Sequence, residues 1–377
     1  MDFTLNSEQQ ALADSVERFT ARDYDFATRG ALIATGGGFS RENWSRFAEL
    51  GWLGAGLPEA AGGFGGGAIE TMIIAERLGR ALILEPLGPV AIHALQTLAA
   101  APSTALRDDL VSSIITGERL VTVAHNEAPA RGDVGFVEAR YENGRISGAK
   151  SLALAAPLAD RLIVSARGPA GVGLYLVDPC ASGLKSVPYR LLDNSRAADL
   201  TFEGTPVEAE LAAPPAAVAA IAAGCDQALV ATCAEAVGVM DAAIAITREY
   251  LKTRRQFGAP LSSFQALQHR MADMLVELEL SRSIVYQGVA ALALSGAERA
   301  RGLSAMKAIV SVAAMFVGRN AVQLHGGIGM TEENAIGHYY RRLFVIAAQS
   351  GDEAFHLRRM AANVRPFWPE PAAEAVA

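Results

Sequence analysis

The stretch "GFVEARYENGRISGAKSLAL", residues 135–154, decides the fold because it cannot continue the helical pattern on either side of it. Its short runs alternate apolar and polar side chains around Glu142, Asn143 and Gly144, and Asn-Gly is a strong hairpin signal. Similar runs begin at about residue 119 and follow one another without helical segments. About seven closely spaced strands of this kind predict an antiparallel barrel or sandwich. We assign residues 119–212 to this middle β domain.

The residues on both sides of this domain follow a helical period. Near the start, Leu12, Val16 and Phe19 stand at i, i+4 and i+7, and Ser7 is a suitable N-cap residue before them. We predict an N-terminal helical domain over residues 1–118 and a C-terminal four-helix bundle over residues 213–377, which makes the fold class α+β. The expected helices are residues 41–51, 69–80, 87–100 and 104–116 before the β domain, and 215–252, 264–295, 298–324, 334–349 and 352–363 after it.

A glycine-rich stretch, "GLPEAAGGFGGGAIE" at residues 56–70, interrupts the first helical domain. Pro58 and the five glycines between residues 62 and 67 cannot continue a helix. A phosphate cradle would need a strand before the stretch and Lys-Ser or Lys-Thr after it, and neither is present. We expect a structural or lid loop here.

The composition excludes several classes of protein. The 377 residues include 33 Lys and Arg against 40 Asp and Glu, with no basic run of the kind that binds nucleic acid. Hydrophobic residues make up 51% and charged residues 19% of the chain, which is typical of a globular protein. Cys180, Cys225 and Cys233 lack metal-ligand spacing and fit a reducing compartment.

The N-terminus and the apolar segments favour a cytoplasmic protein. The opening "MDFTLNSEQQ" lacks the charged and then apolar pattern of an export or transit segment. The apolar stretch "AAVAAIAAGC", residues 216–225, meets Asp226 and Gln227 before it reaches the length of a membrane span. We expect a buried helix there and no span.

Two motifs in the C-terminal region could contact a cofactor. In "RRQFGAPLSSFQALQHRMADM", residues 254–274, cations stand at the end of a long apolar helix, where they also suit the helix dipole. In "QLHGGIGMTEENAIGHYYRRL", residues 323–343, glycines follow a helix and not a strand, which argues against a nicotinamide fingerprint but allows close backbone approach. His325 has no second His or carboxylate at ligand spacing, so we expect a loop or core histidine and no metal site.

These motifs together resemble the acyl-CoA dehydrogenase family, and the resemblance extends over nearly the whole chain. It rests also on "LNSEQQAL" at 5–12, "ELGWLGAGLPEAAGG" at 49–63, "NEAPARGD" at 126–133 and "ISGAKSLALAAPLADRLIVSAR" at 146–167. It implies a helical domain, a β-barrel-like middle domain and a four-helix bundle, usually in tetramers. FAD would lie between the domains and across a subunit interface.

The resemblance implies that one motif reaches the FAD of a neighbouring subunit. Arg254, Gln256 and Phe257 match the family's R-x-x-F-G segment, in which the guanidinium meets the pyrophosphate. A planar guanidinium suits phosphate oxygens because it can donate two parallel hydrogen bonds. These three residues are therefore expected cofactor contacts.

Further flavin contacts are implied in the same way. Gln323, Gly326 and Gly327 match the Q-x-x-G-G turn that also lies on the neighbour's FAD. Asn126 stands at the usual Thr position beside the flavin ring, while Leu154 replaces another usual Thr. The ring contacts thus depart from the family's pattern.

The reaction implied is the α,β-desaturation of an acyl-CoA thioester, with electrons passed on to an electron-transferring flavoprotein. A carboxylate removes the α-proton while donors stabilise the enolate oxygen and the flavin accepts a hydride. In "QSGDE", residues 349–353, the family's usual catalytic Glu falls on Ser350, and a hydroxyl cannot replace a carboxylate base at neutral pH. Asp352 and Glu353 are the carboxylates nearest to this position. Either they supply the base, or they cap the N-terminus of the last helix.

Some family members carry the base on the first long bundle helix instead. That position falls near Ala228, and Asp226 lies two residues away, which is about 200° around a helix and points it elsewhere. The "GDEAFHLRR" ending resembles a bacterial subgroup similar to members that act on steroid side-chain or dicarboxylic acyl-CoAs, in which one of two paired chains can lack the base.

Three hypotheses follow. The chain is an active desaturase, in a homo-tetramer or a hetero-tetramer with a related chain, that uses Asp352 or Glu353. Alternatively it is a subunit with a degenerate site that completes FAD binding for a related chain. The third hypothesis is a helical scaffold without flavin.

Overall fold

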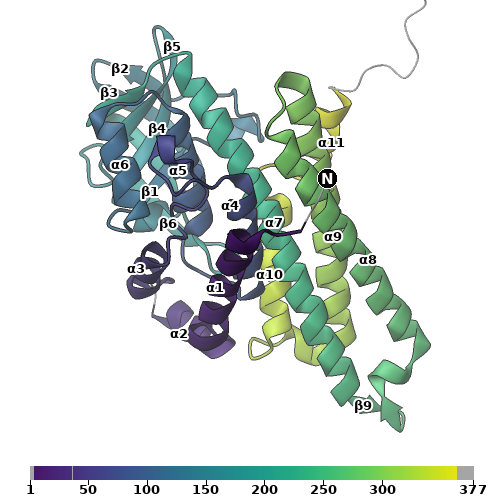
Figure 1. Ribbon diagram of the computed structural model, residues 1–377. Coiled ribbons are helices and arrows are strands. Elements are labelled where there is room, and N and C mark those ends of the chain that lie inside the picture. The colour runs from purple at the N-terminus through teal and green to yellow at the C-terminus, as the bar shows by residue number, and fades with distance from the viewer. Residues whose placement is uncertain (1–3, 36, 363–377) are drawn as a thin grey trace, which may run out of the picture.

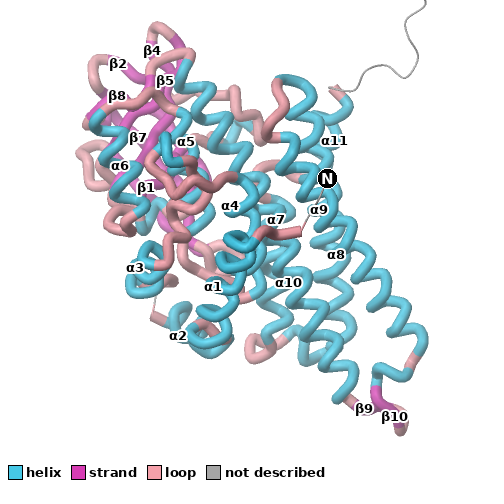
Figure 2. The backbone as a smooth tube through the Cα atoms, in the orientation of Figure 1, coloured by secondary structure: helices cyan, strands magenta, loops and turns pink. Residues whose placement is uncertain are grey.

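The computed structural model describes residues 4–35 and 37–362. Helices come first, a sheet follows, and long helices end the chain, so the predicted order of helical, β and helical parts is confirmed (Figures 1 and 2). The boundaries at residues 118 and 212 stay predictions, and residues 363–377 of the third predicted domain lie outside the described residues.

The N-terminal helices begin at recognisable caps. Asn6, and not Ser7, caps the first helix: its side chain accepts a hydrogen bond from the main-chain N–H of Gln9 at 2.8 Å, and the Gln9 side chain accepts from the N–H of Asn6. This capping box satisfies two N–H groups that the helix itself leaves unpaired, and the predicted cap was wrong by one residue. The helices are α1 (Ser7–Asp23), α2 (Phe26–Ala34), α3 (Arg41–Glu49), α4 (Ala68–Arg80), α5 (Leu95–Ala100) and α6 (Ala105–Ile115).

Two segments between these helices depart from regular α-helix. Residues 56–67 of the glycine-rich stretch contain the 3-10 turn η1 (Glu59–Ala61) and no other helix or strand, so the predicted loop is confirmed, and α4 begins at Ala68. The segment predicted as one helix over residues 87–100 begins instead as an eight-residue π-helix, η2 (Leu87–Ala94), and continues as α5. A π-helix is wider than an α-helix and rare, and it is frequently found at functional sites.

The middle part is one open sheet. Its order is β6-β7-β3-β2-β4-β5-β8, and β1 also pairs with β4. Asn143 and Gly144 join β2 to β3 with positive φ angles of 49° and 77°, as a tight two-residue hairpin requires. The strands are β1 (Val121–Ala124), β2 (Arg140–Glu142), β3 (Arg145–Leu154), β4 (Arg161–Gly168), β5 (Gly171–Val177), β6 (Leu184–Arg190), β7 (Arg196–Pro206) and β8 (Ala209–Ala212).

The sheet is not closed, so the predicted barrel or sandwich is a barrel only in a loose sense, and the strands are not all antiparallel. Strand β4 runs parallel to β1 and, at one pair, to β2, so the sheet is mixed. The β2–β3 hairpin lies between β1 and β4 in the sequence and serves as the crossover that parallel neighbours need. Alternation along each strand predicts a strand but contains no information about its direction.

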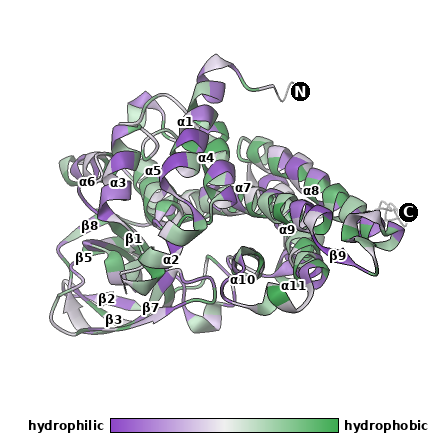
Figure 3. Cartoon of the chain, turned by 90° about the horizontal axis from the view of Figure 1, so that it is seen from below, coloured by the Kyte–Doolittle hydropathy of each residue, from purple (hydrophilic) through white to green (hydrophobic). Residues whose placement is uncertain are grey.

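The C-terminal part is a bundle of long helices, as predicted. Helix α7 runs through Asp226 and Gln227 without a break, so these residues do not shorten the apolar segment. Both α7 and α9 are long and apolar enough to cross a membrane, but 78% and 56% of their most apolar windows are buried inside the fold, as in core helices. Figure 3 shows α7 and α9 packed among neighbouring helices. The helices are α7 (Ala216–Thr253), α8 (Gln265–Ala291), α9 (Gly296–His325), α10 (Ala335–Ala348) and α11 (Glu353–Ala361).

A buried ion cluster joins the three parts. Arg342 of α10 donates to Asp193 Oδ2 at 2.6 Å and to both carboxylate oxygens of Glu235 on α7, each at 2.6 Å. Arg29 of α2 donates to the main-chain oxygen of Asp193 at 3.0 Å. Asp193, between β6 and β7, is 3% exposed; burial alone would raise its pKa, but Arg342 holds the pKa below the ordinary value. The sheet is thereby held in place against the bundle.

Candidate functional site

A cavity of about 780 Å³ lies where the three parts meet. Its walls come from η2, the loop after β1, the N-terminal half of α7 and the turn between α10 and α11. Large cavities with apolar walls and a few converging polar groups are typical binding sites for small molecules. The side chains that line this cavity therefore define the candidate site.

The turn between α10 and α11 contains the position where a carboxylate was expected. Ser350 and Gly351 both have positive φ angles, 58° and 94°, which turn the chain sharply between the helices. Lys307 of α9 is fully buried, and its Nζ donates to the main-chain oxygens of Ile346, Ala347 and Gly351 at 3.0–3.1 Å and to Ser311 Oγ at 2.8 Å. The ammonium thus caps the end of α10 and fixes the turn.

His356 holds the same turn from the other side. Its Nε2 is 2.9 Å from the main-chain oxygen of Ser350, and because a carbonyl only accepts, Nε2 carries the proton. Its Nδ1 is buried without a hydrogen-bond partner among the described residues. Burial lowers the pKa of His356 to about 4, so the ring is neutral at pH 7. An imidazole with so low a pKa is a weak base at pH 7, and the contact of its Nε2–H with the main chain gives the ring a structural role.

Asp352 serves as the N-cap of α11. Its Oδ1 accepts a hydrogen bond from the main-chain N–H of Phe355 at 2.8 Å, which is the capping alternative raised by the sequence. Asp352 does line the cavity, whereas Glu353 is exposed and does not. The carboxylate nearest to Ser350 is therefore already engaged in a structural contact.

The α7 wall contradicts one expectation. Both Ala228 and Asp226 line the cavity, so Asp226 does not point away from it. The cavity follows α7 from Ala222 to Glu235 across a wide arc of its surface, and two residues on one helix can both reach it. Burial raises the pKa of Asp226 despite the opposing charges of Arg359 and Arg299, whose Nη1 lies 3.8 Å from Asp226 Oδ2.

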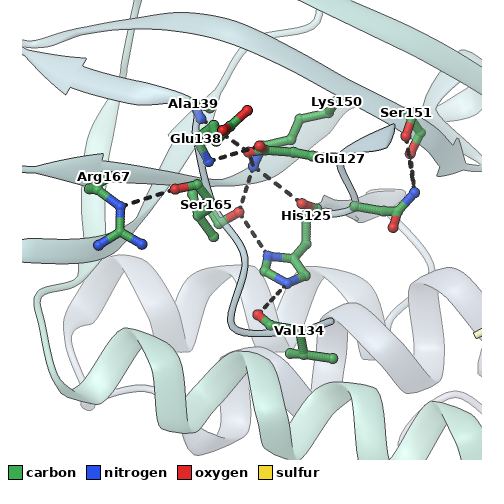
Figure 4. A network of polar contacts seen from close by, with 11 residues as sticks. His125, Glu127, Val134, Glu138, Ala139, Lys150, Ser151, Ser165 and Arg167 are labelled. Carbon is green, nitrogen blue, oxygen red and sulfur yellow. Dashed lines mark hydrogen bonds and ion pairs between the residues drawn. The ribbon is translucent and has the colours of Figure 1, made fainter. Parts of the chain in front are cut away.

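A buried polar network joins His125, Glu127, Lys150 and Ser165 (Figure 4). Lys150 Nζ donates to Glu127 Oε1 at 2.7 Å, to Ser165 Oγ at 2.9 Å and to the main-chain oxygen of His125 at 3.2 Å. One ammonium therefore binds both neighbours of Asn126 in the sequence. Burial alone would raise the pKa of Glu127, but the contacts with Lys150 lower it below the ordinary value.

His125 completes this network and connects it to the cavity loop. Its Nε2 is 2.9 Å from the main-chain oxygen of Val134, so Nε2 donates and Nδ1 accepts from Ser165 Oγ at 2.8 Å. Asn126 lines the cavity and donates from Nδ2 to Ser151 Oγ at 3.0 Å, and Leu154 lies on the same wall. The structure thus brings the two expected ring-contact positions together.

The remaining expected cofactor residues lie at the far end of the bundle. Arg254, Gln256 and Phe257 are exposed at the tip of α7, beside the short hairpin of β9 (Arg255–Gln256) and β10 (Ala259–Pro260), and Phe257 is 92% exposed. None of them lines the cavity. Figure 1 shows β9 at the end of the bundle away from the sheet.

The two C-terminal motifs nevertheless lie side by side. Tyr250 of α7 stacks on His325 of α9 with ring centroids 4.4 Å apart and donates to its main-chain oxygen at 3.2 Å. His325 itself is a buried helix-end histidine whose Nδ1 lies 2.8 Å from the main-chain oxygen of Ala321. Tyr250 was not singled out from the sequence.

This end of the bundle fits the diphosphate of a dinucleotide. Arg254 has no side-chain hydrogen bond or ion pair among the described residues, and Gln256 bonds only its own segment. A Cβ added to Gly326 or Gly327 would meet nothing within 4 Å, so open space adjoins this main chain. An unpaired guanidinium, an amide and accessible main chain are donors that suit phosphate oxygens.

Comparisons with known proteins identify the family of the chain. Models of the acyl-CoA dehydrogenase N-terminal and C-terminal domains match residues 6–118 and 219–365. The chain belongs to the acyl-CoA dehydrogenase family. Members of this family are FAD-dependent oxidoreductases that act on acyl-CoA, so the flavin-free scaffold has no remaining support.

Individual acyl-CoA dehydrogenases match over almost the full chain. Acyl-CoA dehydrogenase IpdE2 of Mycobacterium tuberculosis is 28% identical over 98% of this chain and 100% of its own. A variant of the Tcur3481–Tcur3483 steroid ACAD is 31% identical, with a TM-score of 0.86 over 96% of this chain and 98% of that chain. The ChsE4–ChsE5 complex of Mycobacterium tuberculosis shares the fold, with 24% identity and a TM-score of 0.87 over 96% of this chain and 98% of that chain.

Several residues of the site were not predicted. His93 and Cys225 line the cavity and lie 3.5 Å apart from Nε2 to Sγ, but they are 132 residues apart in the sequence. Lys307 did leave a signal, since it is a single charge within a long apolar run. A lone lysine in a buried helix must find hydrogen-bond acceptors or lose its charge.

Proposed function

We propose that this chain is a subunit of an FAD-dependent enzyme that desaturates an acyl-CoA thioester at its α,β bond, and that the chain lacks a general base of its own. The observation that carries the proposal is the turn between α10 and α11. In this turn Ser350, which the resemblance aligns with the family's base, lines the cavity, while Asp352 caps α11. In this reading the chain binds acyl-CoA and contacts FAD, and a related chain supplies the complete catalytic site.

The cavity supports the binding of an acyl thioester. Its volume of about 780 Å³ is in the range of small-molecule sites, and its walls are held rigid by the Arg342 and Lys150 networks. Bound FAD would supply the acceptor for the hydride that leaves the β-carbon of the acyl group. Asn126 and Leu154 would form the wall next to its ring system.

The bundle supports an assembly with a related chain. Arg254, Gln256, Gln323, Gly326 and Gly327 are the proposed contacts to the FAD of a neighbouring subunit, with Phe257 beside them. Ile309, Val312 and Phe316 are exposed apolar residues at i, i+3 and i+7, so they form a stripe on α9 suited to a protein interface. A hetero-tetramer, electron transfer to an electron-transferring flavoprotein and a cytoplasmic location belong to the same proposal.

The second candidate function is an autonomous desaturase. It is favoured by the fact that the carboxylates lining the cavity include the two that stand closest in sequence to the expected base positions: Asp352, and Asp226 with its pKa raised by burial. A general base works best when its pKa lies closer to the working pH. Under this alternative Asp352 or Asp226 would remove the α-proton.

An anaerobic titration of the FAD-loaded chain with octanoyl-CoA, followed by the visible flavin spectrum, tests the proposal. We expect no bleaching by the wild type and bleaching by Ser350→Glu, because that variant restores a carboxylate to a turn that is already fixed. Ser350→Gln is the matched control, since it has the same size without the charge. Bleaching of the wild-type chain alone would reject the proposal, and Asp352→Asn and Asp226→Asn would then identify the base.

A further inference from the structure

We propose that His93 and Cys225 form a neutral hydrogen-bonding site inside the cavity that recognises an uncharged oxygen substituent, a hydroxyl or a ketone, on the acyl group. The inference rests on the proposed function, because it concerns the ligand of the same cavity. It goes further by naming the chemical class of the acyl group.

The pair lies between apolar side chains on one stretch of the wall, with the charged Asp226 as the next cavity-lining residue on α7. His93 Nε2 and Cys225 Sγ lie 3.5 Å apart, within hydrogen-bond range for sulfur, and both side chains line the cavity. Pro89 and Ile92 beside His93, and Leu229 one turn after Cys225, line the same wall. Nδ1 of His93 has no hydrogen-bond partner among the described residues. A ligand that supplies the missing hydrogen bond to such an atom binds more tightly.

The backbone is built to bring these two side chains together. His93 belongs to the π-helix η2, whose wide turn packs on α7 at Gly224, the residue before Cys225. A Cβ at Gly224 would lie 2.9 Å from the main-chain oxygen of His93, so a larger residue would push the two helices apart. The close approach places the imidazole directly against the thiol.

Both groups are uncharged at neutral pH, which determines the kind of ligand. Burial lowers the pKa of His93 to about 4 and raises the pKa of Cys225 to about 12. If the thiol donates to Nε2, Nδ1–H is a donor for a ketone or hydroxyl oxygen. If Nε2–H donates to sulfur, Nδ1 accepts from a hydroxyl instead. A carboxylate would gain no opposing charge from the pair and would have to lose its water.

Binding of a matched set of thioesters to the FAD-loaded chain tests the inference without any need for turnover. We would measure dissociation constants by calorimetry for octanoyl-CoA, 5-hydroxyoctanoyl-CoA, 8-hydroxyoctanoyl-CoA and octanedioyl-CoA. One net hydrogen bond corresponds to about a fivefold gain in affinity. We expect that gain for at least one hydroxylated thioester over octanoyl-CoA, and none for octanedioyl-CoA.

Variants of the pair identify the source of any preference. His93→Phe keeps the ring volume and should abolish the fivefold preference while octanoyl-CoA still binds, and Cys225→Ala should weaken the preference. Cys233→Ala is the matched control, because Cys233 is buried in the same helix but does not line the cavity. Circular dichroism of each variant verifies that it is folded.

The possible failures are distinguishable. Equal affinities for the four thioesters, or a preference that survives His93→Phe, would overturn the recognition site and leave the proposed function standing. Absence of binding by all four would overturn the proposed function together with this inference. A fivefold gain for octanedioyl-CoA that His93→Phe abolishes would also overturn the inference, because the neutral pair offers a carboxylate no opposing charge; a gain that survives this variant would instead come from the arginines of the cavity, Arg358 and Arg359.

Discussion

Replacing Lys307 by Met should destabilise the protein, because this buried ammonium pairs three main-chain oxygens at the turn that follows α10. Met preserves the length of the side chain but removes every donor. The main-chain oxygen of Ile346 is buried, whereas those of Ala347 and Gly351 are partly buried and can accept from water instead. The loss at Ile346 therefore dominates the effect.

The size of the effect follows from two opposing contributions. An unpaired buried acceptor costs about 1–3 kcal/mol, and the two partly buried oxygens add a smaller amount. The variant also avoids the cost of removing a charge from water, which partly offsets this loss of stability. We expect Lys307→Met to lower the free energy of unfolding by about 2 kcal/mol at pH 7, measured from the denaturant midpoint at unchanged slope.

The pH dependence gives a second, independent readout. Burial lowers the pKa of Lys307 in the folded chain below its ordinary value of 10.5, which it keeps in the unfolded chain. Between the folded and the unfolded pKa, the unfolded chain therefore binds more protons than the folded one. The free energy of unfolding contributed by this group therefore rises as pH rises through that window and is lost as pH falls to the folded pKa. Lys307→Met should lack this rise.

Lys185→Met is the matched control, because Lys185 is an exposed strand residue that pairs only with Glu203 on the surface. It should change stability by less than about 0.5 kcal/mol. If Lys307→Met were as stable as the wild type and kept the same alkaline pH dependence, the lysine would not be the cap of α10 and our account of the turn would be wrong.

Three further predictions concern the other contacts of the site. Asp352→Ala should cost about 1 kcal/mol of stability as a lost N-cap and Asp352→Asn almost nothing, since Asn caps equally well; equal losses in denaturant melts would contradict the cap. Lys150→Met should lower the free energy of unfolding by about 3–5 kcal/mol, because Glu127 then stays charged and buried without its partner. Adding Glu127→Gln should recover part of this loss. A double variant that is no more stable than Lys150→Met would argue against the pairing. With the pKa of Glu127 lowered, the stability from this pair should also be lost as pH falls below its ordinary value of 4.5. Arg254→Ala should weaken FAD retention in the assembled enzyme about tenfold, and Arg254→Lys should have an intermediate effect. Flavin absorbance after gel filtration measures retention. Unchanged retention would mean that the guanidinium has no role.

The sequence predicted the elements of the fold better than their pairing. Helix period and the Asn143-Gly144 turn located the helical parts and the β2–β3 hairpin because both depend on local residues. The parallel pairing of β1 with β4 depends on where β1 enters the sheet, which is a property of the whole chain. An open mixed sheet could not be distinguished from a barrel for this reason.

The candidate site shows the same division. The expected flavin contacts were found in local motifs, and the structure places Asn126 and Leu154 on one cavity wall. Asp226 was misjudged because a helical angle says which way a side chain points, but not how far a cavity extends around the helix. His93 and Cys225 were missed because nothing local connects two residues that meet only through the packing of η2 on α7.

The side chain at position 350 contributes little to the shape of the turn that carries it. Lys307 binds the main chain of α10 and of Gly351, and His356 binds the main-chain oxygen of Ser350, so both clamps act on backbone atoms. A carboxylate could therefore have been exchanged for a hydroxyl here without disturbing the fold. The same independence makes Ser350→Glu a test of chemistry and not of folding: if the fixed turn and the cavity are sufficient, the added carboxylate alone should restore proton removal.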